Sequence, residues 1–506
     1  MPPPTGAAHV LLDSDPRLAA WYLCFGHRAV WGLLFLAGLP VALGLLLLRA
    51  QAQDPQANFE RSRADLLAFK PAPVPDAQNA RLDYEAAGAL YVEPSVFYGA
   101  LTPLQGTQGD PHDSWTWTEQ EGLEYLESGA PGFDLLHAAT RKPRCDWDLE
   151  YAKGGIALPV GHLVRLKGFG RGLLVEASLR ARAGDHAGAA RAVEALFMLA
   201  RRAESDPMLI SGLVAVSIEY MACQAVQDIL ERATPSRTEE VRAYLDAVPP
   251  GPDPFQSISA AMKCERAMGL YELDRMVLGQ ARVSGLEVLP RDLGQVVYGG
   301  ERASYERFMN AIVAKCEARE SIQVGEFRRA FDAHADGSAI FARMMIPSIE
   351  RAQEQYLRAA DLRVAARAAL AALLYRLERG RDVAALEDLV PAYLPEIPRG
   401  WRRGEPLRLR VDAHGYQPTG PHGRPVPPGL LRIYALGHNG EDDYGYCKWV
   451  YEKLPPELEA KIAARVPDRD ANFSAQSHAD DAAFRLPPPA GAAAAPSAPA
   501  GEELEE

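Results

Sequence analysis

Residues 173–204 read LLVEASLRARAGDHAGAARAVEALFMLARRAE and contain the clearest structural pattern of the chain. Leucine and alanine recur every three or four residues on both sides of Gly184 and Asp185, which places apolar side chains on one face of a helix. Glycine readily adopts the left-handed conformation that ends a helix, and the Asp185 side chain can cap the next helix. The stretch therefore predicts two helices joined by a tight turn, an αα-hairpin.

Helical spacing continues after this hairpin. Asp206 before Pro207 predicts the start of a third helix, because proline at the first helical position gives up an N–H that would lack a partner anyway. Ser236 and Glu239 predict the start of a fourth, as a capping box. Further helices are expected over 255–278, 302–317, 321–335 and 347–379. A regular period of about 34 residues is not evident, so residues 76–345 are predicted to form an irregular α-helical array with hairpins similar to tetratricopeptide units.

The spacing of apolar residues changes after the helix expected over 347–379. Residues 386–389 predict a short helix, and apolar side chains in 407–410 and 430–436 follow the pattern of two strands. Residues 346–453 are therefore expected to form the long helix and a small α+β module with a short antiparallel sheet. The end of the chain is rich in proline and alanine and has little apolar surface to bury, so most of 454–506 is predicted to be disordered.

A second decisive stretch is the apolar run AVWGLLFLAGLPVALGLLLL at residues 29–48, which contains no charged side chain. A helix of about twenty residues rises roughly 30 Å, the thickness of the hydrocarbon core of a bilayer. Arg28 and Arg49 bracket the run. The sequence therefore predicts a single N-terminal transmembrane helix, preceded by a stub of residues 1–28 and followed by a polar linker over 49–75.

Two other interpretations of the run stay open. It can be a signal peptide cut after Ala52, or a buried helix of a soluble protein. The run is longer than the apolar region of most signal peptides, and Asp13 and Asp15 precede it where signals carry positive charge. We therefore favour an uncleaved signal-anchor in the inner (cytoplasmic) membrane. The short stub and the large C-terminal part suggest a single pass with the body outside the cytoplasm.

The overall amino-acid composition argues against some classes of protein function. The chain of 506 residues has 54 Lys and Arg against 67 Asp and Glu, a net charge of −13. Nucleic-acid binding needs clustered positive charge, so we expect no nucleic-acid partner. The six cysteines are scattered without zinc-site spacing, and we expect most to be small apolar side chains inside helices. One or two disulfides are an open alternative for a body outside the cytoplasm.

Three local patterns resemble functional motifs, but ordinary structural roles explain each of them at least as well. The glycines of residues 167–172 lack the preceding strand that a phosphate-binding loop needs, and are expected to form a flexible helix entry. The adjacent residues 112–114 (His-Asp-Ser) do not build a catalytic triad, whose members meet in space rather than in sequence. Asp146, Asp148 and Glu150 can flank a sugar but fit a polar loop equally well. No catalytic or cofactor-binding residue is assigned.

Four pieces of the C-terminal region resemble, in order, the C-terminal half of the major pseudopilins of type II secretion systems. They are LYRLERGR (374–381), LEDLVP (386–391), YLP (393–395) and IYALGHNGEDD (433–443). In that family a helix packs on a small antiparallel sheet, and the final loop holds a calcium ion. Pseudopilins carry their apolar helix at the very N-terminus, whereas 28 residues precede it here, so we do not expect assembly into a fibre.

The resemblance implies a calcium site in the last of these pieces. Ca²⁺ takes six to eight oxygen ligands, and Asn439, Asp442 and Asp443, with Glu441, carry suitable oxygens. The alternative is a solvated acidic turn, since Asn-Gly is itself a strong turn signal. Calcium at Asn439, Asp442 and Asp443 is the only cofactor that the sequence suggests.

The rest of the chain resembles a set of large membrane-anchored bacterial proteins, common in planctomycetes, that carry such a C-terminal module. The segments that match are 73–79, 145–151 and 206–210. Together these features predict a non-catalytic, membrane-anchored interaction or scaffold protein of the bacterial cell envelope, with the bilayer and other proteins as partners. The alternatives are an envelope enzyme whose active-site residues meet only in three dimensions, and an accessory protein of a secretion system.

Overall fold

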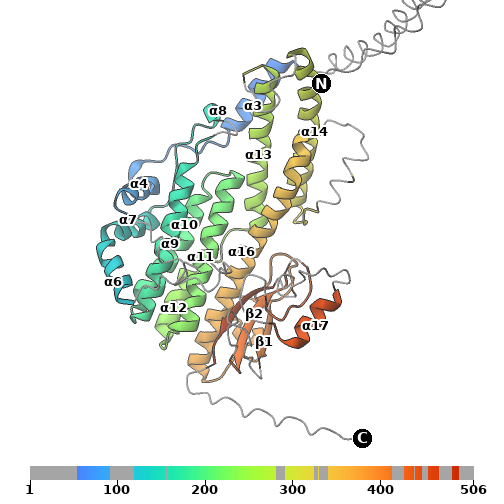
Figure 1. Cartoon of the computed structure of the whole chain (residues 1–506). Helices are drawn as coiled ribbons and strands as arrows, with labels where there is room; N and C mark the ends of the chain where they lie inside the picture. The colour runs from blue at the N-terminus through green and yellow to red at the C-terminus, as the bar shows by residue number, and fades with distance from the viewer. Residues whose placement is uncertain are drawn as a thin grey trace, which may run out of the picture.

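The computed structural model describes residues 54–91, 119–154, 158–280, 291–323, 329, 340–412, 427–437, 439–446, 454–465 and 481–488. This part is mainly helical, with a small three-stranded antiparallel sheet packed on the helices (Figure 1). The predicted stub and transmembrane helix (1–48) lie outside the described residues, as does most of the helix expected over 321–335.

The elements in chain order are α3 (Pro55–Leu67), η2 (Asp76–Gln78), α4 (Ala80–Leu90), α6 (Glu119–Ser128), α7 (Ala130–Arg141), α8 (Tyr151–Gly154), α9 (Gly161–Arg182), α10 (His186–Ala203), α11 (Leu209–Arg232), α12 (Thr238–Ala247), α13 (Pro254–Val277), α14 (Arg291–Glu317), α16 (Ile340–Arg379), η4 (Leu386–Leu389), β1 (Arg408–Asp412), β2 (Leu430–Ala435), α17 (Pro456–Arg465) and β3 (Ala482–Leu486). Among the described helices, α11 has the length and apolar composition of a membrane span. Of its apolar window, 67 % is buried in the body, as in the core helix of a globular domain.

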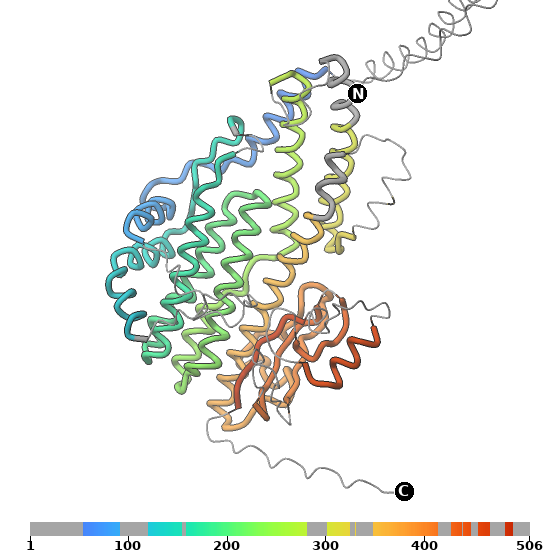
Figure 2. The backbone as a smooth tube through the Cα atoms, viewed as in Figure 1, coloured from blue at the N-terminus to red at the C-terminus, as the bar shows by residue number. Residues whose placement is uncertain are grey.

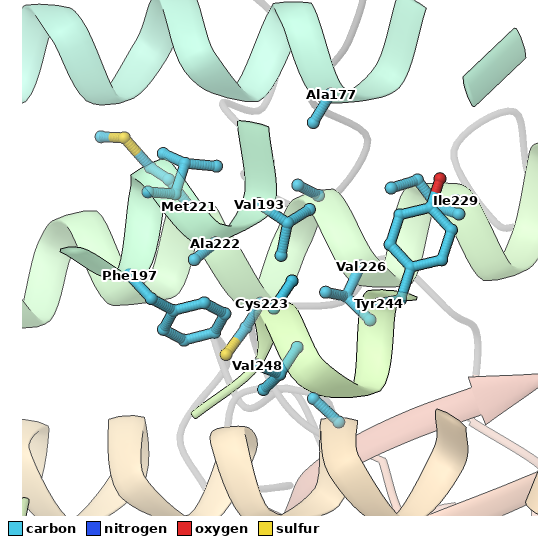
Figure 3. Close-up of a cluster of buried hydrophobic side chains, with 14 of the residues drawn as sticks. Ala177, Val193, Phe197, Met221, Ala222, Cys223, Val226, Ile229, Tyr244 and Val248 are labelled. Carbon is cyan, nitrogen blue, oxygen red and sulfur yellow. The ribbon is translucent and has the colours of Figure 1, made fainter. Parts of the chain in front are cut away.

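The hairpin predicted over 173–204 is confirmed as α9 and α10. Gly184 adopts a φ of 80°, which allows the chain to reverse, and Asp185 Oδ1 accepts a hydrogen bond of 2.8 Å from the Gly188 N–H at the start of α10. Val193 and Phe197 of α10 pack with α11 and α12 residues in the core shown in Figure 3. The local turn residues were therefore sufficient to define this part of the fold.

Helices α11 and α12 begin later than the sequence predicts, whereas α14 and α16 begin earlier. Helix α11 begins at Leu209 instead of near Asp206, because the Asp206 carboxylate accepts a hydrogen bond of 2.9 Å from the Tyr151 hydroxyl and does not cap the helix. Helix α12 begins at Thr238, because Glu240 instead of Glu239 accepts the N–H groups that precede the helix. In both cases the start of the helix depends on a side-chain hydrogen bond that the spacing of residues in the sequence does not predict.

The 40-residue helix α16 is the structural spine of the molecule. Its length corresponds to about 60 Å, and it contacts α11, α12, α13, α14, β2 and β3. It begins at Ile340, so Pro347 lies inside the helix instead of at its predicted start. Arg363 donates to the carbonyls of Pro250 (3.1 Å) and Pro252 (3.2 Å), which satisfies groups in the turn after α12.

The predicted strands are confirmed as β1 and β2, but the sheet has a third strand. Strand β3 lies in the region 454–506 that composition predicted to be mostly disordered, as does α17, so this prediction was wrong for these two elements. Ala482, Phe484 and Leu486 are buried in the core shared with the helices. Tertiary packing therefore stabilises a strand whose local sequence is a weak indicator.

The predicted linker over 49–75 was also wrong for part of its length, because residues 55–67 form α3. This helix packs on α13: Leu66 is fully buried, and the rings of Phe59 and Tyr271 stack with centroids 5.5 Å apart. The buried positions are too few for a clear apolar stripe, which explains why the sequence suggested a polar linker.

The sheet and the helices share one hydrophobic core. A single cluster of buried apolar side chains contains Tyr84 of α4, Leu196 of α10, Leu374 of α16, Ile433 of β2 and Phe484 of β3. The predicted boundary between a helical domain ending at 345 and a module beginning at 346 falls inside α16. Figure 2 shows the described chain beginning at one end of the body, with the sheet against the other half of α16. The C-terminal module is therefore an integral part of the body.

The described cysteines are Cys145, Cys223, Cys264 and Cys316, and all four are buried free thiols. The last three lie in α11, α13 and α14, as expected of small apolar side chains inside helices. Cys24 and Cys447 lie outside the described residues.

Candidate functional site

The residues of the predicted calcium site lie together in the loop that follows β2. Asp443 is fully buried, and its carboxylate accepts hydrogen bonds from Arg465 and Asn439. Its Oδ1 accepts a hydrogen bond of 2.6 Å from Arg465 of α17, and its Oδ2 accepts one of 2.9 Å from the Asn439 amide. Asp443 therefore fastens α17 to the loop.

Asp442 occupies the half-buried side of the same loop. Its Oδ1 accepts hydrogen bonds from the Tyr434 hydroxyl (3.0 Å) and the Tyr444 N–H (2.9 Å), and its Oδ2 accepts one from Arg408. Burial opposes ionisation of this carboxyl, but these donors outweigh burial and lower its pKa. Asp442 is therefore held as a carboxylate that joins β1 to the loop.

A third carboxylate, Asp481, was missed by sequence reasoning. It directly precedes β3 and is fully buried. Its Oδ1 accepts a hydrogen bond from the Gly437 N–H (3.1 Å), and its Oδ2 accepts from the N–H groups of Asp443 (2.9 Å) and Gly445 (3.0 Å). Burial nevertheless raises the pKa of Asp481, to about 8. No local signal marks this residue, because its donors lie more than thirty positions earlier in the chain.

These contacts bear directly on calcium binding. The side-chain oxygens of Asp442, Asp443 and Asp481 all accept hydrogen bonds from protein donors, and Asn439 Oδ1 accepts the Glu441 N–H at 2.9 Å. Within the described part of the chain, no three His, Cys, Asp or Glu side chains are grouped to hold a metal ion. In this arrangement the donor set does not fit a calcium cage without displacement of the arginines. The calcium site stays a prediction.

The other patterns weighed from the sequence have structural explanations. Residues 167–172 lie inside α9 instead of forming a helix entry, and the missing side chain at Gly172 lets Tyr91 approach closely enough to donate a hydrogen bond of 2.7 Å to the Gly168 carbonyl. Asp146 accepts the N–H of Asp148, and the exposed Asp148 pairs with Lys70. Residues 112–114 lie outside the described part.

A cavity of about 370 Å³ lies where α10, α11, α13 and α16 meet. It was not foreseen from the sequence, because its walls come from four separate segments. Its lining residues are Arg201, Glu204, Pro207, Met208, Pro252, Ser257, Ala260, Ala261 and Tyr356. Its walls combine apolar and polar side chains, and such a combination occurs in small-molecule sites.

Glu204 is the main polar group of this cavity. It follows the last residue of α10, and its N–H donates to the Ala200 carbonyl, which closes the helix. The Ser257 hydroxyl donates a hydrogen bond to its carboxyl group, whereas the buried Oε1 has no hydrogen-bond partner among the described residues. Burial raises the pKa of Glu204, and the nearby Glu219 acts in the same direction.

Tyr356 and Arg201 are the other polar residues around Glu204. Tyr356 is 5 % exposed, and its hydroxyl has no hydrogen-bond partner in the described structure. The hydroxyl lies against Gly212 of α11, where a Cβ atom would be only 1.4 Å away. Arg201 is exposed, and its positive charge acts to lower the pKa of Glu204, against the larger effect of burial. The cavity is thus lined by a carboxyl group, a guanidinium group, the Tyr356 side chain and apolar residues.

Comparisons of the chain with models of protein families, with curated proteins and with solved structures find no match. The arguments for function therefore rest on the geometry described above and on the sequence.

Proposed function

We propose that this protein is a membrane-anchored, non-catalytic scaffold of the bacterial cell envelope, with its body held against the lipid surface. The observation that carries the proposal is the position of α3. The apolar run ends at Leu48 and α3 begins at Pro55. Residues 49–54 span at most about 20 Å even when fully extended. A run that spans the bilayer would therefore keep the α3 end of the body close to the membrane.

The contacts of α3 support a firm connection between anchor and body. Phe59 stacks on Tyr271 of α13, Leu66 is fully buried, and Tyr271 also donates a hydrogen bond of 2.7 Å to the Ala152 carbonyl. A helix that is packed in this way cannot act as a flexible stalk. The anchor would therefore restrict the orientation of the body as well as its distance from the bilayer.

The rest of the body extends away from this end along α16. Arg358 in the middle of α16 donates to the Asp481 carbonyl (3.4 Å), and Arg376 near its C-terminal end donates to the Pro487 carbonyl (2.6 Å). Both hydrogen bonds hold β3 against α16, so the sheet lies along the C-terminal half of α16 (Figure 1). We infer that the sheet and α17 are presented to protein partners at a distance from the membrane.

An envelope enzyme is the second candidate, and one observation favours it. Glu204, whose pKa is raised, and Ser257, whose hydroxyl donates to the Glu204 carboxyl group, line the same cavity, and shifted carboxyls in cavities are common in active sites. The described lining of this cavity contains no histidine or lysine to complete such a pair, however. A scaffold therefore accounts for more of the structure.

Site-specific photo-crosslinking in intact membranes tests the scaffold. A crosslinker at Glu60, exposed on α3, is expected to react with lipid. A crosslinker at Ala460, exposed on α17, is expected to capture defined proteins and no lipid. Lipid labelling at Ala460, or no defined adduct at that position, would contradict the proposal. Capture of secretion components would favour the accessory role.

A further inference from the structure

We propose that residues 501–506, which read GEELEE, pair antiparallel with the outer edge of β1 and add a strand to the sheet. The pairing does not depend on the proposed membrane anchoring, because the edge and the acidic segment both lie after α16 in the chain. An open edge, complementary side chains and a short path between them support the proposal.

The two edges of the sheet differ. The strand order is β1-β2-β3, so β1 and β3 are the edge strands. The Gln227 side chain closes the β3 edge, because it bonds to both backbone polar groups of Arg485. No strand among the described residues pairs with the outer edge of β1, and Val411 on this strand is 48 % exposed. The unpaired N–H and C=O groups of an edge strand are a template for another strand, so β1 can accept one.

Two arginines of β1 leave room for further carboxylates. Arg408 pairs with Asp442, and Arg410 pairs with Glu457 and, at 3.6 Å, with Asp412. The arginine side chains are nevertheless 42 % and 31 % exposed. Each guanidinium carries five N–H donors, of which one donates to Asp442 or to Glu457. A neighbouring strand with carboxylates at the matching positions would therefore be held by both arginines.

The acidic segment matches β1 position by position. Residues 503–505 are Glu-Leu-Glu, and residues 408–410 are Arg-Leu-Arg. An antiparallel pairing of these triplets puts each glutamate opposite an arginine, and the two leucines opposite each other on the other face. Opposite charges and apolar side chains that face each other across two strands stabilise a sheet. The same register puts Gly501 opposite Asp412, so no carboxylate of the segment lies directly opposite this acidic residue.

The path from the described chain to this edge is short. Pro488 lies against Gly429, whose N–H donates a hydrogen bond of 2.8 Å to the Asp412 carbonyl. The chain therefore leaves the sheet at the end where β1 finishes, and a segment that returns along the edge runs antiparallel to β1. Residues 489–500 span up to about 40 Å when extended. Three strand spacings, from β3 to the position outside β1, measure only about 14 Å.

Hydrogen exchange of the detergent-solubilised full chain, measured by mass spectrometry on peptides that contain β1, tests the proposal. The comparison is a variant that ends at Ala500 and lacks only the proposed strand. We expect the outward-pointing amides of β1 to exchange at least about tenfold more slowly in the full chain, because they are hydrogen-bonded there. Equal exchange in the two chains would overturn the proposal. Protection that persists in the shortened chain and falls on dilution would assign the edge to a second copy, also contrary to it.

Two matched double variants test the register. Glu503→Lys with Glu505→Lys puts lysines opposite arginines and should raise the exchange rate of β1 to that of the shortened chain, because like charges opposite each other destabilise a sheet. Glu502→Lys with Glu506→Lys changes the net charge equally but on the other face of the strand, and should keep most of the protection. Equal loss of protection in both variants would indicate charge attraction without strand pairing, and would contradict the proposal.

Discussion

The side-chain amide of Gln227 in α11 pairs with both backbone polar groups of Arg485 in β3. Its Nε2 donates to the Arg485 carbonyl at 2.9 Å, and its Oε1 accepts the Arg485 N–H at 2.9 Å, across 258 positions of sequence. The side chain thus takes the place of a neighbouring strand at the edge of the sheet. An unpaired edge is prone to association with other strands, so this pair both fixes the sheet on the helices and closes its edge.

Replacement of Gln227 should destabilise the whole body. Gln227→Leu leaves a buried N–H and a buried carbonyl of Arg485 without partners, and each such group costs about 1–3 kcal/mol. We expect the free energy of unfolding, measured by urea denaturation, to fall by about 2–4 kcal/mol. Gln56→Leu, at an exposed position of α3, is the control and should change little. A loss below about 0.5 kcal/mol for Gln227→Leu would mean that the pair does not hold the sheet.

Gly212 should not tolerate a methyl group. Alanine inside a helix is normally favoured over glycine by about 0.5–1 kcal/mol. A Cβ at Gly212 would however stand 1.4 Å from the Tyr356 hydroxyl, so Gly212→Ala must displace a buried ring. We expect a net loss of about 1–3 kcal/mol in thermal or urea unfolding. Gly161→Ala, with no atom within 4 Å of the new Cβ, is the control and should be neutral or stabilising.

The stability contribution of Asp206 should depend on pH. Burial raises the pKa of Asp206 to about 6, despite the hydrogen bond from Tyr151. The folded chain therefore binds this proton more tightly than the unfolded chain, and stability is lost as pH rises from about 4 to about 6. Relative to Asp206→Asn, the natural chain should lose on the order of 2 kcal/mol between pH 4 and pH 7. Urea unfolding of both proteins at several pH values measures this difference, and parallel curves would contradict the assignment.

Calcium should leave the thermal midpoint of the natural chain unchanged. Arg465 and Arg408 already occupy the carboxylates of Asp443 and Asp442, so the ion would have to displace both guanidinium groups. Melting curves of the full chain with calcium and with a chelator test this expectation. A rise of several degrees with calcium would show that the ion replaces the arginines and that the prediction made from the sequence is correct.

Local signals predicted the fold where local contacts determine it. Gly184 and Asp185 define the hairpin of α9 and α10 because the turn and the cap involve neighbouring residues. Strand β3 was missed because its partners, such as Gln227, lie far away in sequence and its own surroundings are rich in proline and alanine. Helix α3 was missed because it is stabilised mainly by its contacts with α13.

The candidate sites follow the same rule. Asn439, Asp442 and Asp443 are consecutive enough to be recognised as a polar loop, but their partners Arg408 and Arg465 come from a strand and a helix outside it. The cavity of Glu204 and Tyr356 has no local motif at all, since 151 intervening residues separate these two positions. Only the packing of α10 and α16 against α11 brings them together.

Membrane fractionation of the natural host or of an expressing cell tests the central claim most directly. The full-length chain, with its N-terminus verified by mass spectrometry, should stay in the membrane pellet after an alkaline carbonate wash and dissolve only in detergent. Leu36→Arg with Leu39→Arg should shift it toward the soluble fraction, because each arginine costs about 2.5–3.5 kcal/mol near the centre of a span. Recovery of the uncleaved natural chain as a soluble protein without detergent would contradict the account.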